Sequence, residues 1–133
     1  METRPGECPM TKRIRIRCGE LEAAATLNET DTAQAIWEAL PIKGSANVWG
    51  DEIYFRIPVA LTEDNAQEVV ELGDLGYWPP GSAFCIFFGP TPMSHGDEIR
   101  PASPVNVFGR VECNLFALKN VSGDSPILIE RMD

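Results

Sequence analysis

Apolar and polar side chains alternate strictly over residues 12–18, where the isoleucines share one face and the arginines share the other. This period of two predicts a β-strand with one buried face. A turn at Gly19 and Glu20 leads into a second predicted strand over residues 21–27. Glu20 and Glu22 are placed to face the arginines across this hairpin, as cross-strand pairs of opposite charge do. The basic cluster of the chain therefore has a structural explanation.

The segment after the hairpin has the period of a helix. Asp31 is the predicted N-cap, and Gln34 stands at the position that completes a capping box. Apolar residues then recur at the i, i+3, i+4 and i+7 positions of one helical face. They are Ala33, Ile36, Trp37 and Leu40. Pro41 ends the helix, because proline lacks the N–H that an interior position needs.

Beyond the helix the chain returns to short β-segments. The predicted strands cover residues 52–57, 83–88, 105–118 with a break near Gly109, and 125–132. The whole chain thus shows roughly eight short strands and one clear helix, a content typical of a β-barrel or a β-sandwich.

Two loops with unusual compositions are predicted between these strands. Residues 73–81 are rich in glycine, proline and aromatic side chains, and residues 89–104 contain four prolines. In the first loop, Tyr77 and Trp78 form a rigid apolar surface suited to a peptide or a small planar ligand. In the alternative interpretation this loop closes one end of the barrel, with Trp78 packed beneath it. An irregular segment as long as the second loop is usually functional or mobile.

Length and charge narrow the class of protein. The 133 residues fit a single domain, and we expect a flexible tail over residues 1–11 followed by one domain over residues 12–133. With 11 basic and 20 acidic side chains the net charge is −9, which argues against nucleic acid and membrane surfaces as partners. The longest apolar run, residues 83–88, is far too short to span a membrane. No export signal is visible, so we expect a cytoplasmic protein with reduced cysteines.

The sequence contains no conventional catalytic motif. Glycine-rich phosphate loops and Cys-x-x-Cys pairs are absent. The single histidine, His95, adjoins Ser94, and neighbouring residues of an extended chain point apart. His95 with Asp97 and Glu98 is a weak metal pattern, so neither a metal nor another cofactor is expected. Arg56 lies on the non-core face of its predicted strand, either as a surface side chain or as the cation of a pocket.

Two segments carry a resemblance to a known fold. Residues 82–92 (SAFCIFFGPTP) and 105–111 (VNVFGRV) resemble the C-terminal half of a cyclophilin. Residues 49–53 together with 73–92 are more closely similar to a family of small, uncharacterised bacterial and archaeal proteins with a cyclophilin-like fold. The resemblance covers residues 12–130. It implies a mainly β fold, a closed eight-stranded barrel with one or two helices capping its ends.

The resemblance also implies a cleft of the kind in which cyclophilins isomerise prolyl bonds. In that family an arginine hydrogen-bonds the prolyl nitrogen beside an aromatic-lined proline pocket. The arginine corresponds to Arg56, although the spacing to the next proline is one residue shorter here. Cyclophilin pocket positions that carry glutamine, phenylalanine and histidine fall on Ala83, Cys85 and Val105, and the loop tryptophan is nearest to Met93. These replacements predict weak isomerase activity at most.

We therefore predict a domain that binds a small molecule or a short peptide in this cleft. The expected ligand-binding residues supply one charge, three aromatic walls and two hydroxyl groups: Arg56, Tyr77, Trp78, Phe87, Thr91 and Ser94. Two alternatives remain, a weak peptidyl-prolyl isomerase and an accessory subunit of an amide- or lactam-hydrolysing system. The sequence leaves open a homodimer.

Overall fold

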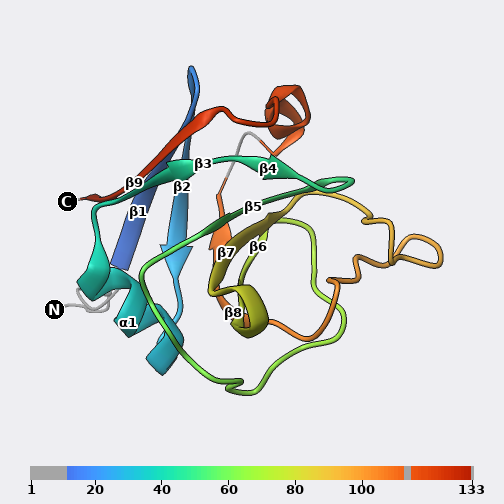
Figure 1. The fold of residues 1–133 in the computed structure, drawn as a ribbon, viewed down its shortest axis with the longest axis horizontal. Coiled ribbons are helices and arrows are strands. Elements are labelled where there is room, and N and C mark those ends of the chain that lie inside the picture. The colour runs from blue at the N-terminus through green and yellow to red at the C-terminus, as the bar shows by residue number, and fades with distance from the viewer. Residues whose placement is uncertain (1–11, 113–114, 133) are drawn as a thin grey trace, which may run out of the picture.

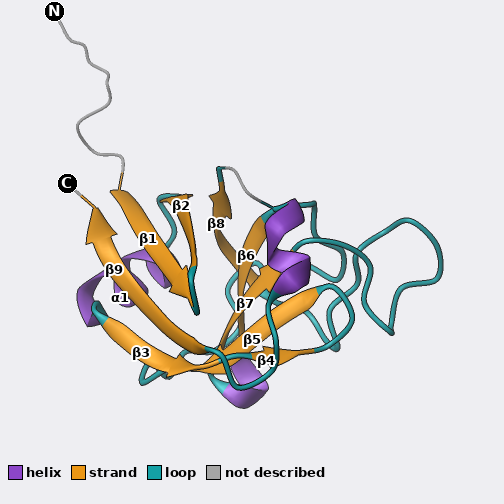
Figure 2. Cartoon of the chain, turned by 90° about the horizontal axis from the view of Figure 1, so that it is seen from above, coloured by secondary structure: helices purple, strands orange, loops and turns teal. Residues whose placement is uncertain are grey.

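The computed structural model describes residues 12–112 and 115–132, so the tail predicted over residues 1–11 lies outside the described part. In chain order the elements are β1 (Lys12–Cys18), β2 (Leu21–Leu27), α1 (Asp31–Ala39), β3 (Ile42–Ser45), β4 (Asn47–Val48), β5 (Glu52–Arg56), β6 (Asp74–Trp78), η1 (Pro79–Gly81), β7 (Ala83–Phe87), β8 (Asn106–Val111), η2 (Phe116–Asn120) and β9 (Pro126–Met132). The strands form a 9-stranded antiparallel sheet in the order β3-β9-β1-β2-β8-β6-β7-β5-β4, which curves into a nearly closed barrel (Figure 1 and Figure 2). The predicted mainly β barrel is confirmed, with one strand more than expected.

The two ends of the sheet meet in a single stretch of chain. β3 and β4 are the outermost strands of the sheet order, yet only Ala46 separates them in the sequence. Ala46 is buried, and its N–H donates to Ser125 O at 2.8 Å. The sequence prediction missed both strands, which are only four and two residues long and contain one buried residue, Ile42. A Cβ at Gly44 would lie 2.7 Å from the Phe55 ring, so a larger apolar side chain has no room there.

The N-cap of helix α1 lies one residue earlier in the chain than the sequence predicts. Thr30, and not Asp31, is the N-cap, and its side chain accepts a hydrogen bond from Ala33 N at 3.1 Å. The Gln34 side chain bonds to a glutamate one turn later, so no capping box forms. Ile36 is fully buried in the core, and α1 thereby covers one end of the barrel (Figure 1).

The barrel interior is a packed aromatic and aliphatic core. The Phe84 ring lies between two others, with centroid distances of 5.2 Å to Phe55 and 5.1 Å to Phe108. The first pair is stacked and the second is edge to face, both favourable arrangements of aromatic rings. The three rings come from β5, β7 and β8, which lie close together in the sheet order, and they form one aromatic group of the barrel core.

The segment over residues 73–81, predicted as a loop, contains strand β6. This strand pairs with β7 on one side and with β8 on the other. Its turn-forming residues misled the prediction, because pairing on both sides overrides local propensity. Gly76 shows the physical reason for a glycine in a strand. A Cβ there would lie 2.8 Å from Val105 and 3.1 Å from the Phe87 ring. The close packing on the outer face therefore leaves no room for a side chain at residue 76.

The strand predicted over residues 105–118 is shorter than expected. β8 ends at Val111, and the short 3-10 helix η2 occupies Phe116–Asn120, while residues 113–114 lie outside the described part. None of the helices in the described residues has the length and apolarity that crossing a membrane requires.

Candidate functional site

Strands β5, β7 and β6 present a second apolar surface on the outside of the barrel. Tyr54 on β5 pairs with Cys85 on β7, and Ala83 on β7 pairs with both Arg56 and Trp78 on the flanking strands. Side chains that are directly paired, or two residues apart on one strand, share a face of the sheet. These five side chains therefore point away from the barrel core.

Loop segments cover part of this outer face. Six buried residues form an apolar cluster separate from the barrel core, here called the outer cluster: Val70, Ala83, Cys85, Phe87, Ile99 and Val105. Backbone bridges from residue 67 to residue 105 and from residue 70 to residue 99 tie the covering segments to each other. Part of the irregular loop over residues 89–104 thus covers the outer face of the sheet. The rest of this loop projects to one side of the barrel (Figure 1).

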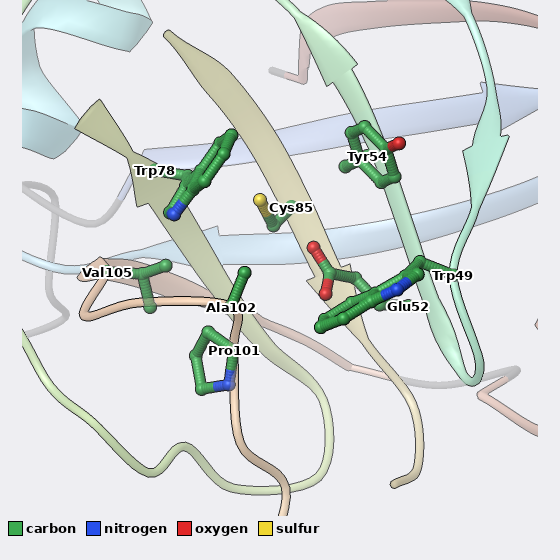
Figure 3. Close-up of a pocket in the computed structure, with 8 residues that line it drawn as sticks. All are labelled: Trp49, Glu52, Tyr54, Trp78, Cys85, Pro101, Ala102 and Val105. Atoms are coloured by element: carbon green, nitrogen blue, oxygen red, sulfur yellow. The ribbon is translucent and has the colours of Figure 1, made fainter. Parts of the chain in front are cut away.

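A pocket of about 270 Å³ opens where the outer cluster meets this loop. Its walls, shown in Figure 3, are mainly aromatic and aliphatic, and the name outer pocket refers to these residues: Trp49, Glu52, Tyr54, Trp78, Cys85, Pro101, Ala102 and Val105. The carboxyl of Glu52 lies between the Trp78 ring on one side and the Trp49 and Tyr54 rings on the other (Figure 3). A single ionisable acid thus faces an otherwise apolar space.

Glu52 is a buried carboxyl with an unsatisfied oxygen. Its relative exposure is 5%, and Oε1 has no hydrogen-bond partner among the described residues. Burial raises the pKa of Glu52 from 4.5 to about 7, and a hydrogen bond from the Cys85 thiol lowers it in part. The carboxyl therefore changes its charge near neutral pH, far above the ordinary range of a glutamate.

Cys85 lies against Glu52 as a neutral thiol. Burial raises its pKa well above the ordinary value, and both the negative charge and the hydrogen bond of Glu52 raise it further. Only the thiolate is a good nucleophile, so Cys85 is unsuited to covalent catalysis in this environment. The thiol also lies 3.9 Å from the carbonyl oxygen of Ala83, to which it is placed to donate.

Trp78 is the sequence-predicted ligand residue that lines the outer pocket. Its indole Nε1 donates to Ser103 Oγ at 2.6 Å, which fixes the ring against the covering loop. The ring is half-buried and packs on the outer cluster. Its edge toward Glu52 remains available as a wall of the pocket (Figure 3).

Tyr77 lies on the opposite face of β6, inside the barrel. It has no exposed surface, and its hydroxyl donates to Val59 O at 2.5 Å and accepts from Leu61 N at 3.0 Å. Successive residues of a strand point to opposite faces, so Tyr77 and Trp78 do not share one cavity. Tyr77 instead anchors the chain that follows β5.

Replacing Tyr77 with phenylalanine is expected to lower the free energy of unfolding by about 1–3 kcal/mol. The change leaves a part-buried N–H at Leu61 and a part-buried carbonyl at Val59 without the hydroxyl that pairs them, and losing such partners costs about this much. Urea denaturation of both proteins measures the loss. Tyr54→Phe is the matched control, because the Tyr54 hydroxyl makes no hydrogen bond within the described residues, and a loss as large in the control would contradict this account.

The other predicted site residues lie near the pocket without lining it. Arg56 is exposed on the outer face of β5, opposite Ala83, and it does not line the pocket. Phe87 is fully buried in the outer cluster. Thr91 N donates to Ser94 Oγ at 3.0 Å, and the Thr91 hydroxyl donates to the Arg100 carbonyl. The two hydroxyl groups therefore hold the shape of the covering loop.

The carboxyl that dominates the pocket was not among the predicted site residues. The alternation over residues 52–57 places Glu52 and Tyr54 on the non-core face, but the burial of that face depends on a loop fifty residues later in the chain. The cyclophilin resemblance gave the better signal. It equates Cys85 and Val105 with positions of the isomerase pocket, and both line the outer pocket. Within the described residues, no group of three or more His, Cys, Asp or Glu side chains is arranged to hold a metal ion.

Comparison with known proteins agrees with the fold. A family model described as Cyclophilin-like matches residues 12–130. The chain is also similar to a structure described as the solution structure of the hypothetical protein AF2241 from Archaeoglobus fulgidus. The two chains are 48% identical, the match covers 96% of this chain and 100% of that one, and the TM-score is 0.80. No curated protein matches the chain. The predicted resemblance is thus confirmed over nearly the whole chain, which belongs to the Cyclophilin-like family.

Proposed function

We propose that this protein binds a small molecule in the outer pocket. The observation that carries the proposal is Glu52, a buried carboxyl whose Oε1 lacks a partner among the described residues, set in a cavity with aromatic walls. A buried polar atom without a hydrogen-bond partner lowers the stability of the folded protein, and such atoms are rare in protein cores that serve only a structural role. A ligand that forms the missing hydrogen bond with Glu52 would account for this unpaired oxygen.

The size of the outer pocket favours a compact ligand. Its volume of about 270 Å³ is at the lower limit of ordinary small-molecule sites, which span roughly 300–1,000 Å³. The covering loop, through Pro101 and Ala102, closes one wall. The pocket therefore suits a small molecule or one side chain of a short peptide, and not an extended peptide.

Binding without isomerisation accounts best for the residues present. Electrostatic catalysis of prolyl rotation needs a cation beside the prolyl nitrogen. Arg56 does not line the outer pocket, and the cyclophilin pocket positions carry Ala83, Cys85 and Val105, which offer neither a ring nor a strong donor. Isomerase activity and an accessory role in amide or lactam hydrolysis stay sequence predictions, without a structural observation in their favour.

Tryptophan fluorescence tests the proposal directly. Two of the three tryptophans, Trp49 and Trp78, line the outer pocket. The third, Trp37, belongs to α1, and the Arg131 guanidinium lies over its ring. In titrations with benzylamine, benzyl alcohol and benzoate, at least one probe should change the emission of the wild-type protein and of Trp37→Phe. Trp78→Ala should lose the response. If none of the three probes alters emission or melting temperature at millimolar concentration, the proposed function is wrong.

A further inference from the structure

We propose that the outer pocket selects a protonated organic amine with a compact apolar body, whose ammonium group donates to the Glu52 carboxylate. The apolar body then lies against the rings of Trp49, Tyr54 and Trp78 (Figure 3). This inference rests on the proposed function and specifies the chemical class of its ligand.

The first step concerns the hydrogen-bonding capacity of Glu52. An ionised carboxylate is only an acceptor, with about four lone-pair positions. Cys85 supplies one weak donor, and Oε1 has no partner among the described residues. The missing partner is therefore a donor, and a charged N–H donor gives the strongest such bond. A carboxylate or phosphate ligand would instead bring like charge to a buried acid.

The second step concerns the missing counter-charge. The groups that face Glu52 are Tyr54 on its own strand, the thiol of Cys85 on β7, and the uncharged loop residues 101, 102 and 105. Arg56 shares the outer face of β5 but stands beside Ala83, outside the pocket lining. Among the described residues, no cationic side chain lines the pocket, so the positive charge has to come from a ligand or from a proton.

The third step concerns the rings on either side of the carboxyl. A cation near the face of a tryptophan or tyrosine is attracted by the ring quadrupole, and more strongly when it is shielded from water. Trp49 and Tyr54 lie on one side of Glu52, and Trp78 lies on the other (Figure 3). The same rings bury the carbon skeleton of an organic amine. A cation held here is thus attracted by both the carboxylate and the rings.

Inorganic cations fit this pocket poorly. Calcium needs six to eight oxygen ligands, and magnesium keeps most of its water shell. The outer pocket offers one carboxylate among aromatic and aliphatic walls, and the described residues hold no metal-ligating cluster. The net charge of −9 attracts cations of every kind to the protein, so the selection of an organic cation depends on the pocket lining.

Protonation links the ligand to pH. Glu52 has a pKa of about 7, while Cys85 stays protonated because its own pKa is raised. An ammonium ligand favours the ionised carboxyl, so its affinity should rise between pH 5 and pH 8, where a basic amine keeps its proton. A neutral ligand of the same shape lacks this dependence.

The test compares benzylamine, benzyl alcohol and benzoate, three probes of the same shape and different charge, by fluorescence titration at pH 5 and pH 8. We expect benzylamine to bind at least about tenfold more tightly than benzyl alcohol at pH 8, the ratio that a charge-assisted hydrogen bond provides. The ratio should fall below about threefold at pH 5 and in Glu52→Gln. Equal binding of benzylamine and benzyl alcohol, or tighter binding of benzoate, would overturn the amine inference and leave the proposed function intact. No binding of any probe would overturn both.

Two controls keep the result interpretable. Glu20→Gln removes the same charge from an exposed position and should leave the tenfold ratio unchanged. The second control needs no variant: in wild-type protein labelled with ¹³C at the glutamate carboxyls, benzylamine should lower the pKa of Glu52 by at least about one unit, and an unchanged pKa would contradict the inference. A lysine blocked at its α-amino and α-carboxyl groups keeps its side-chain ammonium and distinguishes the source of the amine. Tighter binding of this probe than of benzylamine assigns the amine to a peptide side chain.

Discussion

At pH 8, replacing Glu52 with glutamine is expected to raise the free energy of unfolding by about 3 kcal/mol. The folded protein raises the pKa of this carboxyl from 4.5 to about 7, and each pKa unit corresponds to about 1.4 kcal/mol. The carboxyl is nearly inaccessible to solvent, so screening by water offsets little of this cost. Glutamine has nearly the same shape and carries no charge, and the cost of burying a carboxylate disappears with it.

The sign of this effect fixes its pH dependence. The folded protein binds the Glu52 proton more tightly than the unfolded chain does, so the corresponding stability is complete below pH 4.5. It is lost as the pH rises from 4.5 through about 7. Wild type and Glu52→Gln should therefore have nearly equal stabilities at pH 4 and diverge by pH 8.

Urea denaturation at pH 4, 6 and 8 measures this divergence. Other titrating groups are common to the two proteins, and their effects cancel in the difference. Glu20→Gln, at an exposed position of the β1–β2 turn, should follow the wild type at all three values. If the free energies of unfolding of wild type and Glu52→Gln changed with pH in the same way, the carboxyl would be hydrated in the folded state, contrary to its burial.

The fold was predictable where local pattern and pairing agree. The alternation over residues 12–18, the turn at Gly19 and the return strand form the β1–β2 hairpin that was expected, with Cys18 opposite Leu21. The resemblance supplied the closure of the barrel, which no local pattern shows. Gly44 and Gly76 mark the places where prediction failed, because the Phe55 ring at Gly44, and the Val105 and Phe87 side chains at Gly76, occupy the space that a larger side chain would fill.

The outer pocket was predictable in location and not in composition. Alternation correctly assigned Arg56 to the non-core face of its strand, together with Glu52 and Tyr54. Arg56 was predicted as the charged group of the site. Glu52 was not predicted, because the sequence of a strand does not show whether a loop elsewhere in the chain buries one of its acidic side chains. The loop that covers Glu52 is distant in sequence, and it excludes water from Glu52 while leaving Arg56 exposed. Reading residues 73–81 as a loop also placed Tyr77 and Trp78 on one surface, which strand alternation forbids.

Phe84→Ala is expected to lower the free energy of unfolding by about 3–5 kcal/mol, the range for truncating a fully buried phenylalanine. Its ring contacts those of Phe55 and Phe108, so the truncation leaves a cavity between three strands that cannot collapse easily. Urea denaturation at pH 7 without ligand measures the loss. Phe116→Ala is the matched control, because Phe116 is 83% exposed, and its truncation should change stability by less than about 0.5 kcal/mol.

The same variant separates the two faces of β7. Phe84 points into the barrel, whereas its neighbour Cys85 points into the outer pocket. At a temperature where Phe84→Ala remains folded, its affinity for benzylamine should stay within about twofold of wild type, because its contacts lie on the face opposite the pocket. A large loss of affinity with little loss of stability would mean that the barrel core sets the pocket geometry, and the division of β7 into a structural face and a binding face would be wrong.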